Sequence, residues 1–279
     1  MKINYLDHLF SLKGKTAIVT GASGYFGERF SEALLSAGAK VVMFGRSEKI
    51  NFIAKKLKIK YGTNRVDHYR VDFYDDYQYQ NCLKEVISEN KRIDILINNA
   101  YEFSKHTGFN DSSGKLENIS KEQWMKSLES GVYWHALAIQ KVCKKMKEQK
   151  SGSIINVSSM YALISPDPKL YEGVDIFNPP SYGVAKAGLL ALTRYSAAFL
   201  GGYGIRCNAI VPGSFPNDDP KAYNSPKNNK FIKKLRAKTI LGRTGNVQDL
   251  LGCIVFLASD SSSYITGQSI VIDGGWTTT

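Results

Sequence analysis

Short strand-like runs alternate with longer helix-like segments through the first hundred residues, and this alternation constrains the fold more than any other feature. The runs have the length and composition of buried strands and occupy residues 15–20, 40–45, 66–71 and 93–98. The segments between them read as helices and occupy residues 25–37, 48–61 and 74–90. Alternation at this pace predicts an α/β fold with a parallel sheet covered on both faces.

The second half of the chain continues the pattern. Further strands are expected over residues 153–158, 204–211 and 268–272, and helices over residues 121–150, 182–200, 231–238 and 247–258. Ser120 and Gln123 have the spacing of a capping box, and Gly131 is expected to weaken the helix that follows them. We find no repeat, linker or second domain, so we expect residues 1–279 to form a single domain.

Three stretches lack periodicity and are interpreted as loops. The first covers residues 101–120. Residues 160–181 hold four prolines, and residues 213–240 begin rich in Pro, Asn and Lys before a helical end. Long irregular segments in a compact domain are usually functional, so we interpret these last two as a substrate loop and a lid.

A glycine-rich turn separates the first strand from the first helix. Gly21, Gly24 and Gly27 give the spacing G-x-x-G-x-x-G, which differs from the G-x-G-x-x-G of other dinucleotide folds. Glycines here permit a tight turn and close approach of the backbone to a pyrophosphate, and the helix N-terminus offers free N–H groups to the anion. The position of the turn therefore predicts a dinucleotide site.

The end of the second strand bears on the choice between NAD and NADP. An acidic residue at this point holds the ribose 2′-hydroxyl, whereas an arginine accepts a 2′-phosphate. The strand ends in Arg46 and Ser47, and Glu48 follows too late to serve as that acid. We therefore expect NADP(H) to be favoured over NAD(H). The alternative is that Arg46 is merely exposed or stacks on the adenine.

Tyr182 and Lys186 are four residues apart, which places them on one face of a helix. A phenol beside an ammonium is an acid–base pair, since the positive charge is expected to lower the phenol pKa. Ser158 and Ser159 follow an earlier strand, where serine alone is more often a strand-end hydrogen-bonding residue. The Tyr182–Lys186 spacing and the serine pair are each weak evidence alone. They indicate an active site only in combination with the glycine-rich turn.

Together these motifs resemble the short-chain dehydrogenase/reductase family over nearly the whole chain, from Leu12 to Thr278. The resemblance is carried by Thr20-Gly21…Gly27, Asp72, Asn98-Asn99-Ala100, Ser158-Ser159, Tyr182…Lys186, Pro212-Gly213 and Ile272-Asp273-Gly274-Gly275-Trp276. It implies a Rossmann-type doubly wound parallel sheet of seven strands in the order 3-2-1-4-5-6-7. It also implies NAD(P)-dependent hydride transfer between an alcohol and a ketone.

The resemblance further implies a role for each matching residue. Tyr182 would be the general acid/base, Ser159 would bind the substrate oxygen, and Lys186 would bind the nicotinamide ribose. Asp72 would contact the adenine. The full set expected to contact the cofactor is Gly21, Ser23, Gly24, Tyr25, Phe26, Gly27, Arg46, Ser47, Asp72, Phe73, Asn99, Ala100, Tyr182, Lys186, Pro212, Gly213 and Phe215.

Two departures from the short members resemble the extended, sugar-nucleotide branch. Tyr25 stands where the short members carry the middle glycine of the turn, and Ser159 and Tyr182 are 23 residues apart, a longer spacing than in the short members. The C-terminal half, including Asp273-Gly-Gly-Trp, stays close to the short members. The chain is thus interpreted as a short-type scaffold with two extended-type features.

Two further departures concern the proton relay of the family. Gly131 occupies the place of the asparagine that orders a relay water, and Tyr101 replaces the glycine after Asn-Asn-Ala. The relay therefore needs a substitute, for which Ser130, His135 or a water is a candidate. A protein that has lost catalysis and only binds nucleotide is the non-enzymatic alternative.

The two interpreted segments supply the residues expected around the substrate. They are Tyr161, Asp167, Tyr171, Glu172 and Asp175 in the loop, and Asn217, Lys221, Tyr223 and Lys227 in the lid. Polar and aromatic walls suit a hydroxylated substrate. The chain also resembles gluconate-type dehydrogenases and surface-glycan enzymes, which implies a sugar, sugar acid or sugar nucleotide. The alternative is an epimerase or dehydratase that retains its cofactor.

Composition limits the other classes of function. The net charge is +12, but the lysines are scattered, which indicates a solvated surface and no nucleic-acid partner. The alternative is an acidic or phosphorylated substrate. The cysteines, Cys82, Cys143, Cys207 and Cys253, are far apart, so we expect no metal site and a reducing, cytoplasmic setting. No apolar run is long enough to span a membrane. By resemblance we expect a homo-oligomer, a dimer or tetramer.

Overall fold

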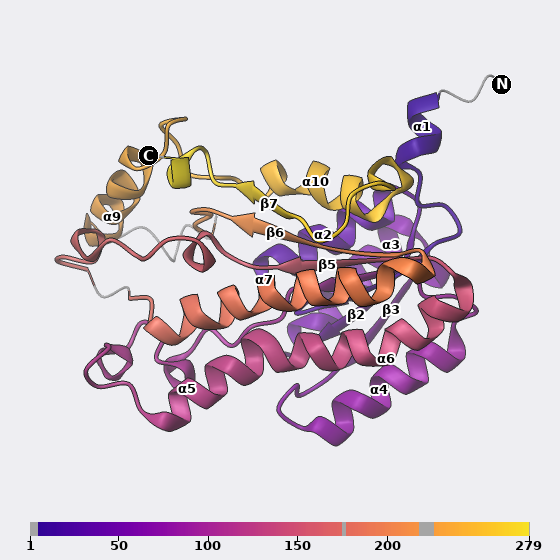
Figure 1. Cartoon of the computed structure of the whole chain (residues 1–279), viewed down its shortest axis with the longest axis horizontal. Helices are drawn as coiled ribbons and strands as arrows, with labels where there is room; N and C mark the ends of the chain where they lie inside the picture. Colours follow the sequence, from indigo (N-terminus) through magenta and orange to yellow (C-terminus); the bar gives the residue numbers. More distant parts are fainter. Residues whose placement is uncertain (1–4, 175–176, 218–225, 279) are drawn as a thin grey trace.

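The computed structural model describes residues 5–174, 177–217 and 226–278, and its centre is a seven-stranded parallel sheet (Figure 1). The strand order is β3-β2-β1-β4-β5-β6-β7, so the predicted doubly wound α/β fold and its strand order are confirmed. The strands are β1 (Thr16–Thr20), β2 (Lys40–Gly45), β3 (Val66–Arg70), β4 (Ile95–Asn98), β5 (Gly152–Val157), β6 (Ile205–Pro212) and β7 (Ser269–Ile272).

The central strands are apolar because helices bury them on both sides. In β1, Ile18 pairs with Val42 of β2 and Leu96 of β4, and all three side chains are fully buried. One face of the sheet packs on α2 (Tyr25–Ser36), α3 (Lys49–Tyr61) and α10 (Gln248–Ala258). The other face packs on α4 (Asp76–Glu89), α6 (Trp134–Gln149) and α7 (Pro180–Leu200), as Figure 1 shows. This layering leaves the carboxyl ends of the strands open for a site.

The helix predicted over residues 121–150 is interrupted around Gly131. It divides into α5 (Lys121–Leu128), a π-helical turn (Glu129–Tyr133) and α6. The predicted capping box is present: Ser120 Oγ accepts from the Gln123 N–H at 3.1 Å, and Gln123 Oε1 accepts from the Ser120 N–H at 3.0 Å. Single π turns inside α-helices occur frequently at functional sites.

The predicted loops contain short helical turns that their sequences do not signal. Residues 101–120 form two 3₁₀ turns, Lys105–Thr107 and Ser112–Gly114, and the substrate loop forms two more, Met160–Ala162 and Pro168–Leu170. The substrate loop is also shorter than predicted, because α7 begins at Pro180, a residue that suits the first helical position. An N-terminal helix, α1 (Tyr5–Phe10), was not predicted.

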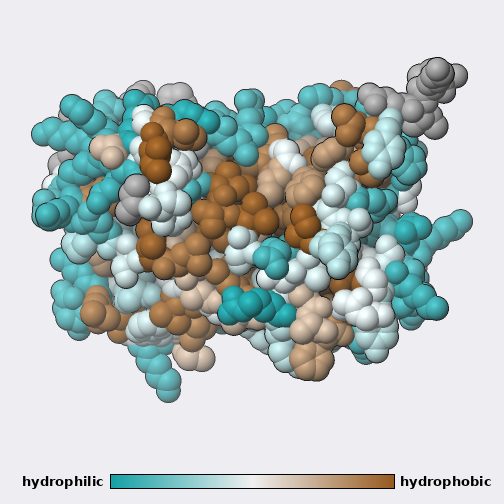
Figure 2. All heavy atoms as spheres, turned by 45° about the horizontal axis from the view of Figure 1, so that its top comes forward, coloured by the Kyte–Doolittle hydropathy of each residue, from teal (hydrophilic) through white to brown (hydrophobic). Residues whose placement is uncertain are grey.

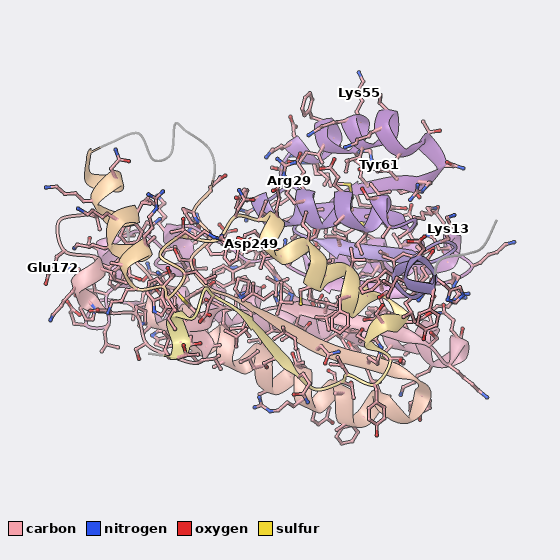
Figure 3. The ribbon with its side chains drawn as sticks, turned by 90° about the horizontal axis from the view of Figure 1, so that it is seen from above. Lys13, Arg29, Lys55, Tyr61, Glu172 and Asp249 are labelled. Carbon is pink, nitrogen blue, oxygen red and sulfur yellow. The ribbon has the colours of Figure 1, made fainter. Side chains whose placement is uncertain are left out.

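The lid ends in α9 (Pro226–Ala237), a longer helix than the predicted 231–238. Lys234 on α9 donates to the carbonyl oxygens of Lys169, at 2.6 Å, and Glu172, at 3.1 Å, and so ties the lid to the substrate loop. Seen from above, Glu172 lies beside this helix, far from α3 and its labelled Lys55 (Figure 3). Asp175, Lys221, Tyr223 and the side chain of Lys227 lie outside what the structure describes.

Some large apolar residues remain exposed, among them Ile240, Leu241 and Val271 of β7. Figure 2 shows apolar atoms gathered across the middle of one face. Within the described ranges, no helix combines the length and apolar character needed to cross a bilayer.

Candidate active site

A cavity of about 640 Å³ opens where the carboxyl ends of β1, β2 and β4 meet. We call it the nucleotide cavity. It is lined by Gly21, Ser23, Gly24, Tyr25, Phe26, Arg46, Ser47, Phe73, Asn99, Ala100, Tyr101, Glu102, Phe103, Trp134, Phe215 and Asn217. Most residues of the predicted cofactor set are therefore brought together. Gly27, Asp72, Tyr182, Lys186, Pro212 and Gly213 do not line this cavity.

The glycine-rich turn forms one wall. Gly21 has a φ of +65°, and a Cβ placed on it would lie 2.8 Å from Ala100 Cα, so only glycine fits there. Gly27 faces inward, since a Cβ there would collide with the Gly21 carbonyl. Gly24 caps α2 without a side-chain hydrogen bond, which leaves the first-turn N–H groups to an anion. These features fit the pyrophosphate of a dinucleotide.

Asn99 connects the end of β4 to this turn. Its side-chain Nδ2 donates to the carbonyl oxygens of Thr20 and Gly21, each at 3.1 Å. Thr20 Oγ1 in turn accepts from the backbone N–H groups of Asn99 and Ala100, at 3.0 and 3.2 Å. The sequence motif therefore holds two strand ends in register around the cavity.

Arg46 and Ser47 line the cavity at the end of β2, as predicted. The Arg46 guanidinium forms an ion pair with the carboxylate of Glu102, which follows Tyr101 in the loop after β4. The hydrogen bond between the two side chains raises the pKa of Arg46, and the negative charges of Glu102 and Asp72 add to this effect. Together they outweigh partial burial, which lowers the pKa. Sequence analysis did not identify Glu102, because nothing in the sequence reports that its loop faces β2.

Asp72 is exposed beside the cavity, and its neighbour Phe73 forms part of the wall. The Asp72 side chain accepts from the Tyr74 N–H at 3.1 Å, and its own N–H donates to Gln78 at 2.7 Å. Phe73 packs on Trp134, with ring centroids 5.1 Å apart. The wall is thus continued by a residue of α6 that sequence analysis did not select.

Tyr182 and Lys186 lie side by side on α7, both buried, with exposed fractions of 8% and 2%. Lys186 Nζ lies 5.9 Å from the centroid of the Tyr182 ring and donates to the Val157 carbonyl at 2.9 Å. Ser159 lies near enough to Tyr182 to affect the pKa of its hydroxyl. Ser158 is instead a structural residue, since its Oγ donates to the Lys186 carbonyl at 2.9 Å. The three predicted catalytic residues are therefore adjacent.

The pKa values of this group differ from the sequence-based expectation. Burial raises the pKa of Tyr182 to about 12, although the hydrogen bond from Ser159 opposes this. Burial also lowers the pKa of Lys186 to about 7. The expectation of a lowered phenol pKa is wrong here, because loss of solvation outweighs any effect of the nearby ammonium.

Three aromatic rings from residues 101–120 surround Tyr182. The centroids of Tyr101, Phe109 and Phe103 lie 5.1, 5.2 and 5.9 Å from that of Tyr182. On the substrate loop, the Tyr161 and Tyr171 hydroxyls are 3.2 Å apart, and Asn178 donates to Tyr171 at 2.6 Å. The region around Tyr182 thus has an aromatic side, which sequence analysis missed, and a polar side.

Tyr101 fills the space next to Gly131. A Cβ at residue 131 would lie 2.7 Å from Ala185 Cβ and 3.2 Å from Tyr101 Cε2. The Tyr101 hydroxyl is hydrogen-bonded to Ser127 at 2.8 Å, and Lys186 Nζ lies 5.1 Å from its ring centroid. The two departures in the relay motif are therefore linked: the Tyr101 ring occupies space that a side chain at residue 131 would need.

This exchange predicts the effect of restoring asparagine. Gly131→Asn should destabilise the protein by about 1–3 kcal/mol, because the new side chain overpacks against Ala185 and Tyr101. Urea denaturation measures the change. Tyr101→Gly combined with Gly131→Asn should recover part of the loss. Gly252→Asn is the control, since residue 252 is exposed with nothing within 4 Å of an added Cβ. Equal losses at residues 131 and 252 would contradict the packing argument.

The other relay candidates lie close by. His135 is buried, and neither ring nitrogen has a hydrogen-bond partner within the described part of the chain. Burial, and secondarily the charge of Lys186, hold the His135 pKa well below its usual value. Ser130 Oγ donates to the Ser127 carbonyl at 3.4 Å. His135 is therefore a neutral imidazole at neutral pH, and its two nitrogens are buried without a hydrogen-bond partner among the described residues.

Comparison with known proteins shows which family the chain resembles. A family model described as enoyl-(acyl carrier protein) reductase matches residues 21–277. Sorbose reductase of Candida albicans is 34% identical over 98% of this chain and 90% of its own. The 2-dehydro-3-deoxy-D-gluconate 5-dehydrogenase of Bacillus subtilis is 29% identical over 98% of this chain and 99% of its own.

A solved structure agrees as well. Gluconate 5-dehydrogenase of Burkholderia cenocepacia, in complex with NADP and tartrate, superposes with a TM-score of 0.83 at 26% identity, covering 99% of this chain and 100% of that one. The family model, the relatives and the shared fold all cover nearly the whole chain. The chain therefore belongs to the short-chain dehydrogenase/reductase family, whose members are NAD(P)-dependent oxidoreductases.

Proposed function

We propose that this enzyme interconverts an alcohol and a ketone on a carbohydrate-type substrate, with NADP(H) as the preferred cofactor. The observation that carries the proposal is the buried group of Ser159, Tyr182 and Lys186 at the same sheet edge as a cavity fitted to a dinucleotide. When bound there, the nicotinamide supplies or accepts the hydride. The names of the relatives, a sorbose reductase and a gluconate-type dehydrogenase, support the substrate class.

Each residue of the group has a defined part. Ser159 donates a hydrogen bond to the substrate oxygen, and Tyr182 gives that oxygen a proton in reduction or takes one in oxidation. Lys186 compensates the phenolate, whose formation burial makes costly, and holds the nicotinamide ribose. The members of the predicted cofactor set that line the cavity hold the rest of the nucleotide, and Asp72, exposed beside it, contacts the adenine.

The preference for NADP(H) rests on Arg46, and its removal gives a prediction. Arg46→Gln should weaken NADPH binding about 10- to 100-fold and change NADH binding little, because a charge-assisted hydrogen bond to the 2′-phosphate is lost. Quenching of protein fluorescence by each nucleotide measures both dissociation constants. Arg29→Gln on α2 (Figure 3) is the matched control, as Arg29 pairs only weakly with Glu32 at 3.4 Å. Parallel weakening of NADPH and NADH would refute the assignment.

The substrate class is tested by a screen. Sugars, sugar acids and sugar nucleotides are offered with NADP and NAD, and the corresponding ketones with the reduced forms, while absorbance at the nicotinamide band is followed. Turnover of a polyhydroxylated compound is expected, since Tyr161, Tyr171 and Asn178 give the substrate region hydrogen-bonding groups. Turnover of 3-oxoacyl thioesters alone would contradict the proposal.

The geometry does not favour the epimerase or dehydratase alternative. That alternative was motivated by the 23 residues between Ser159 and Tyr182. Two 3₁₀ turns take up the extra length, and Ser159 remains near enough to Tyr182 to affect the pKa of its hydroxyl. The spacing therefore leaves the arrangement of a dehydrogenase in place.

We also propose a homo-oligomer in the cytoplasm. Tyr195 and Phe199 on α7 stack with centroids 4.3 Å apart, although they are 61% and 63% exposed, which suits a contact between copies. Sedimentation velocity should give a dimer or tetramer, and Tyr195→Glu with Phe199→Glu should reduce its size. A monomeric wild type would refute the oligomer. The four cysteines are free thiols, which supports a reducing compartment.

A further inference from the structure

Glu102 is an acidic residue in the wall of the nucleotide cavity. The side chain is only 5% exposed, yet it forms part of the cavity wall. A buried carboxylate needs a cation or several hydrogen-bond donors, and here the ion-pair partner is Arg46. Arg46, which is proposed to recognise a 2′-phosphate, is therefore already paired with Glu102.

The Arg46–Glu102 ion pair lies where a bound nucleotide would contact it. Arg46 follows β2 and Glu102 lies in the loop after β4, and these two strands flank β1 on opposite sides. The pair thus connects the two sides of the sheet edge on which the glycine-rich turn lies. Both partners line the same cavity as Gly21 and Ala100.

The two cofactors make different demands on this pair. A 2′-phosphate brings two negative charges toward Arg46. It must either share the Arg46 guanidinium with Glu102 or draw it away, and in both cases the buried Glu102 carboxylate is less well paired. It also approaches a like charge. A ribose 2′-hydroxyl needs no cation and can donate a hydrogen bond to a carboxylate. Asp72 adds a second acid near Arg46, exposed to solvent and therefore of smaller effect.

We propose that Glu102 is a second cofactor-specificity residue, which moderates the preference for NADP(H) by competing with the 2′-phosphate for Arg46. This inference rests on the proposed function, in which Arg46 recognises that phosphate. It places the specificity acid in the loop after β4, a different segment from the end of β2. An enzyme of this design uses NADP(H) without rejecting NAD(H).

The test is the ratio of two dissociation constants. In Glu102→Gln, which keeps the size of the side chain, the ratio of the NADH to the NADPH constant should rise about tenfold over the wild type, mainly through tighter NADPH binding. Fluorescence titration of the full-length protein gives both constants. Glu117→Gln, an exposed acid of the same loop, is the matched control and should leave the ratio unchanged. Glu102→Leu is the second variant and should raise the ratio similarly.

A variant without Arg46 distinguishes competition for the Arg46 guanidinium from a general effect of Glu102 on NADPH binding. In Arg46→Gln the further change Glu102→Gln should improve NADPH binding much less than in the wild type, because no guanidinium is released. An unchanged or lower ratio in both Glu102 variants would overturn the inference. The proposed function fails differently: then the wild type binds neither nucleotide, or Arg46→Gln alone does not weaken NADPH binding.

Discussion

Replacing Tyr182 by phenylalanine should lower kcat/KM about 10³-fold while nucleotide binding stays within about twofold of the wild type. The hydroxyl is the proposed proton donor and acceptor, so its loss removes proton transfer at the substrate oxygen. The ring, which packs against Tyr101, Phe103 and Phe109, is retained. Because burial raises the pKa of the hydroxyl to about 12, removing it leaves no buried charge behind at neutral pH.

The measurements separate chemistry from folding. Steady-state kinetics on a substrate identified by the screen gives kcat/KM, NADPH titration gives the binding constant, and thermal unfolding checks the fold. Tyr77→Phe removes the hydroxyl of an exposed tyrosine on α4 and should leave all three unchanged. Full activity in Tyr182→Phe would remove the case for acid–base catalysis at residue 182.

The sheet was predictable because its signal is local. Buried parallel strands are rich in apolar residues, and β1, β2 and β4 show this in the sequence through the apolar runs 17–19, 41–44 and 95–97. The glycine-rich turn was predictable for a similar reason, since Gly21 adopts a conformation that other residues rarely adopt. The strand order came from the family resemblance, since alternation alone permits several orders.

The remaining parts of the site depend on contacts between distant segments. Phe103 and Phe109 reach Tyr182 from a loop without periodicity, and Glu102 reaches Arg46 across the end of β1. The link between Tyr101 and Gly131 requires knowing that a ring from one segment fills a gap in another. The raised pKa of Tyr182 follows from burial, which the spacing of two residues does not report. Each of these is a tertiary property.

Lys186→Met should reduce kcat/KM about 10²-fold or more, because the phenolate loses the ammonium that compensates its charge. The same change should alter how stability depends on pH. The folded protein releases the Lys186 proton near pH 7, whereas the unfolded chain holds it until about pH 10.5. Between these values the unfolded state binds more protons, so Lys186 makes wild-type stability rise with pH. Below pH 7 both states are protonated, and the contribution of Lys186 is constant.

The free energy of unfolding of Lys186→Met, minus that of the wild type, should therefore fall as the pH rises from 7 toward 10. The slope should be at most about 1.4 kcal/mol per pH unit. Urea denaturation at several pH values measures this difference, and other titrating groups cancel because both proteins contain them. Lys55→Met, at an exposed site on α3 (Figure 3), should show a constant difference over the same range. A constant difference for Lys186→Met as well would mean that the ammonium is solvated, and its proposed compensation of the buried Tyr182 phenolate would lose its physical basis.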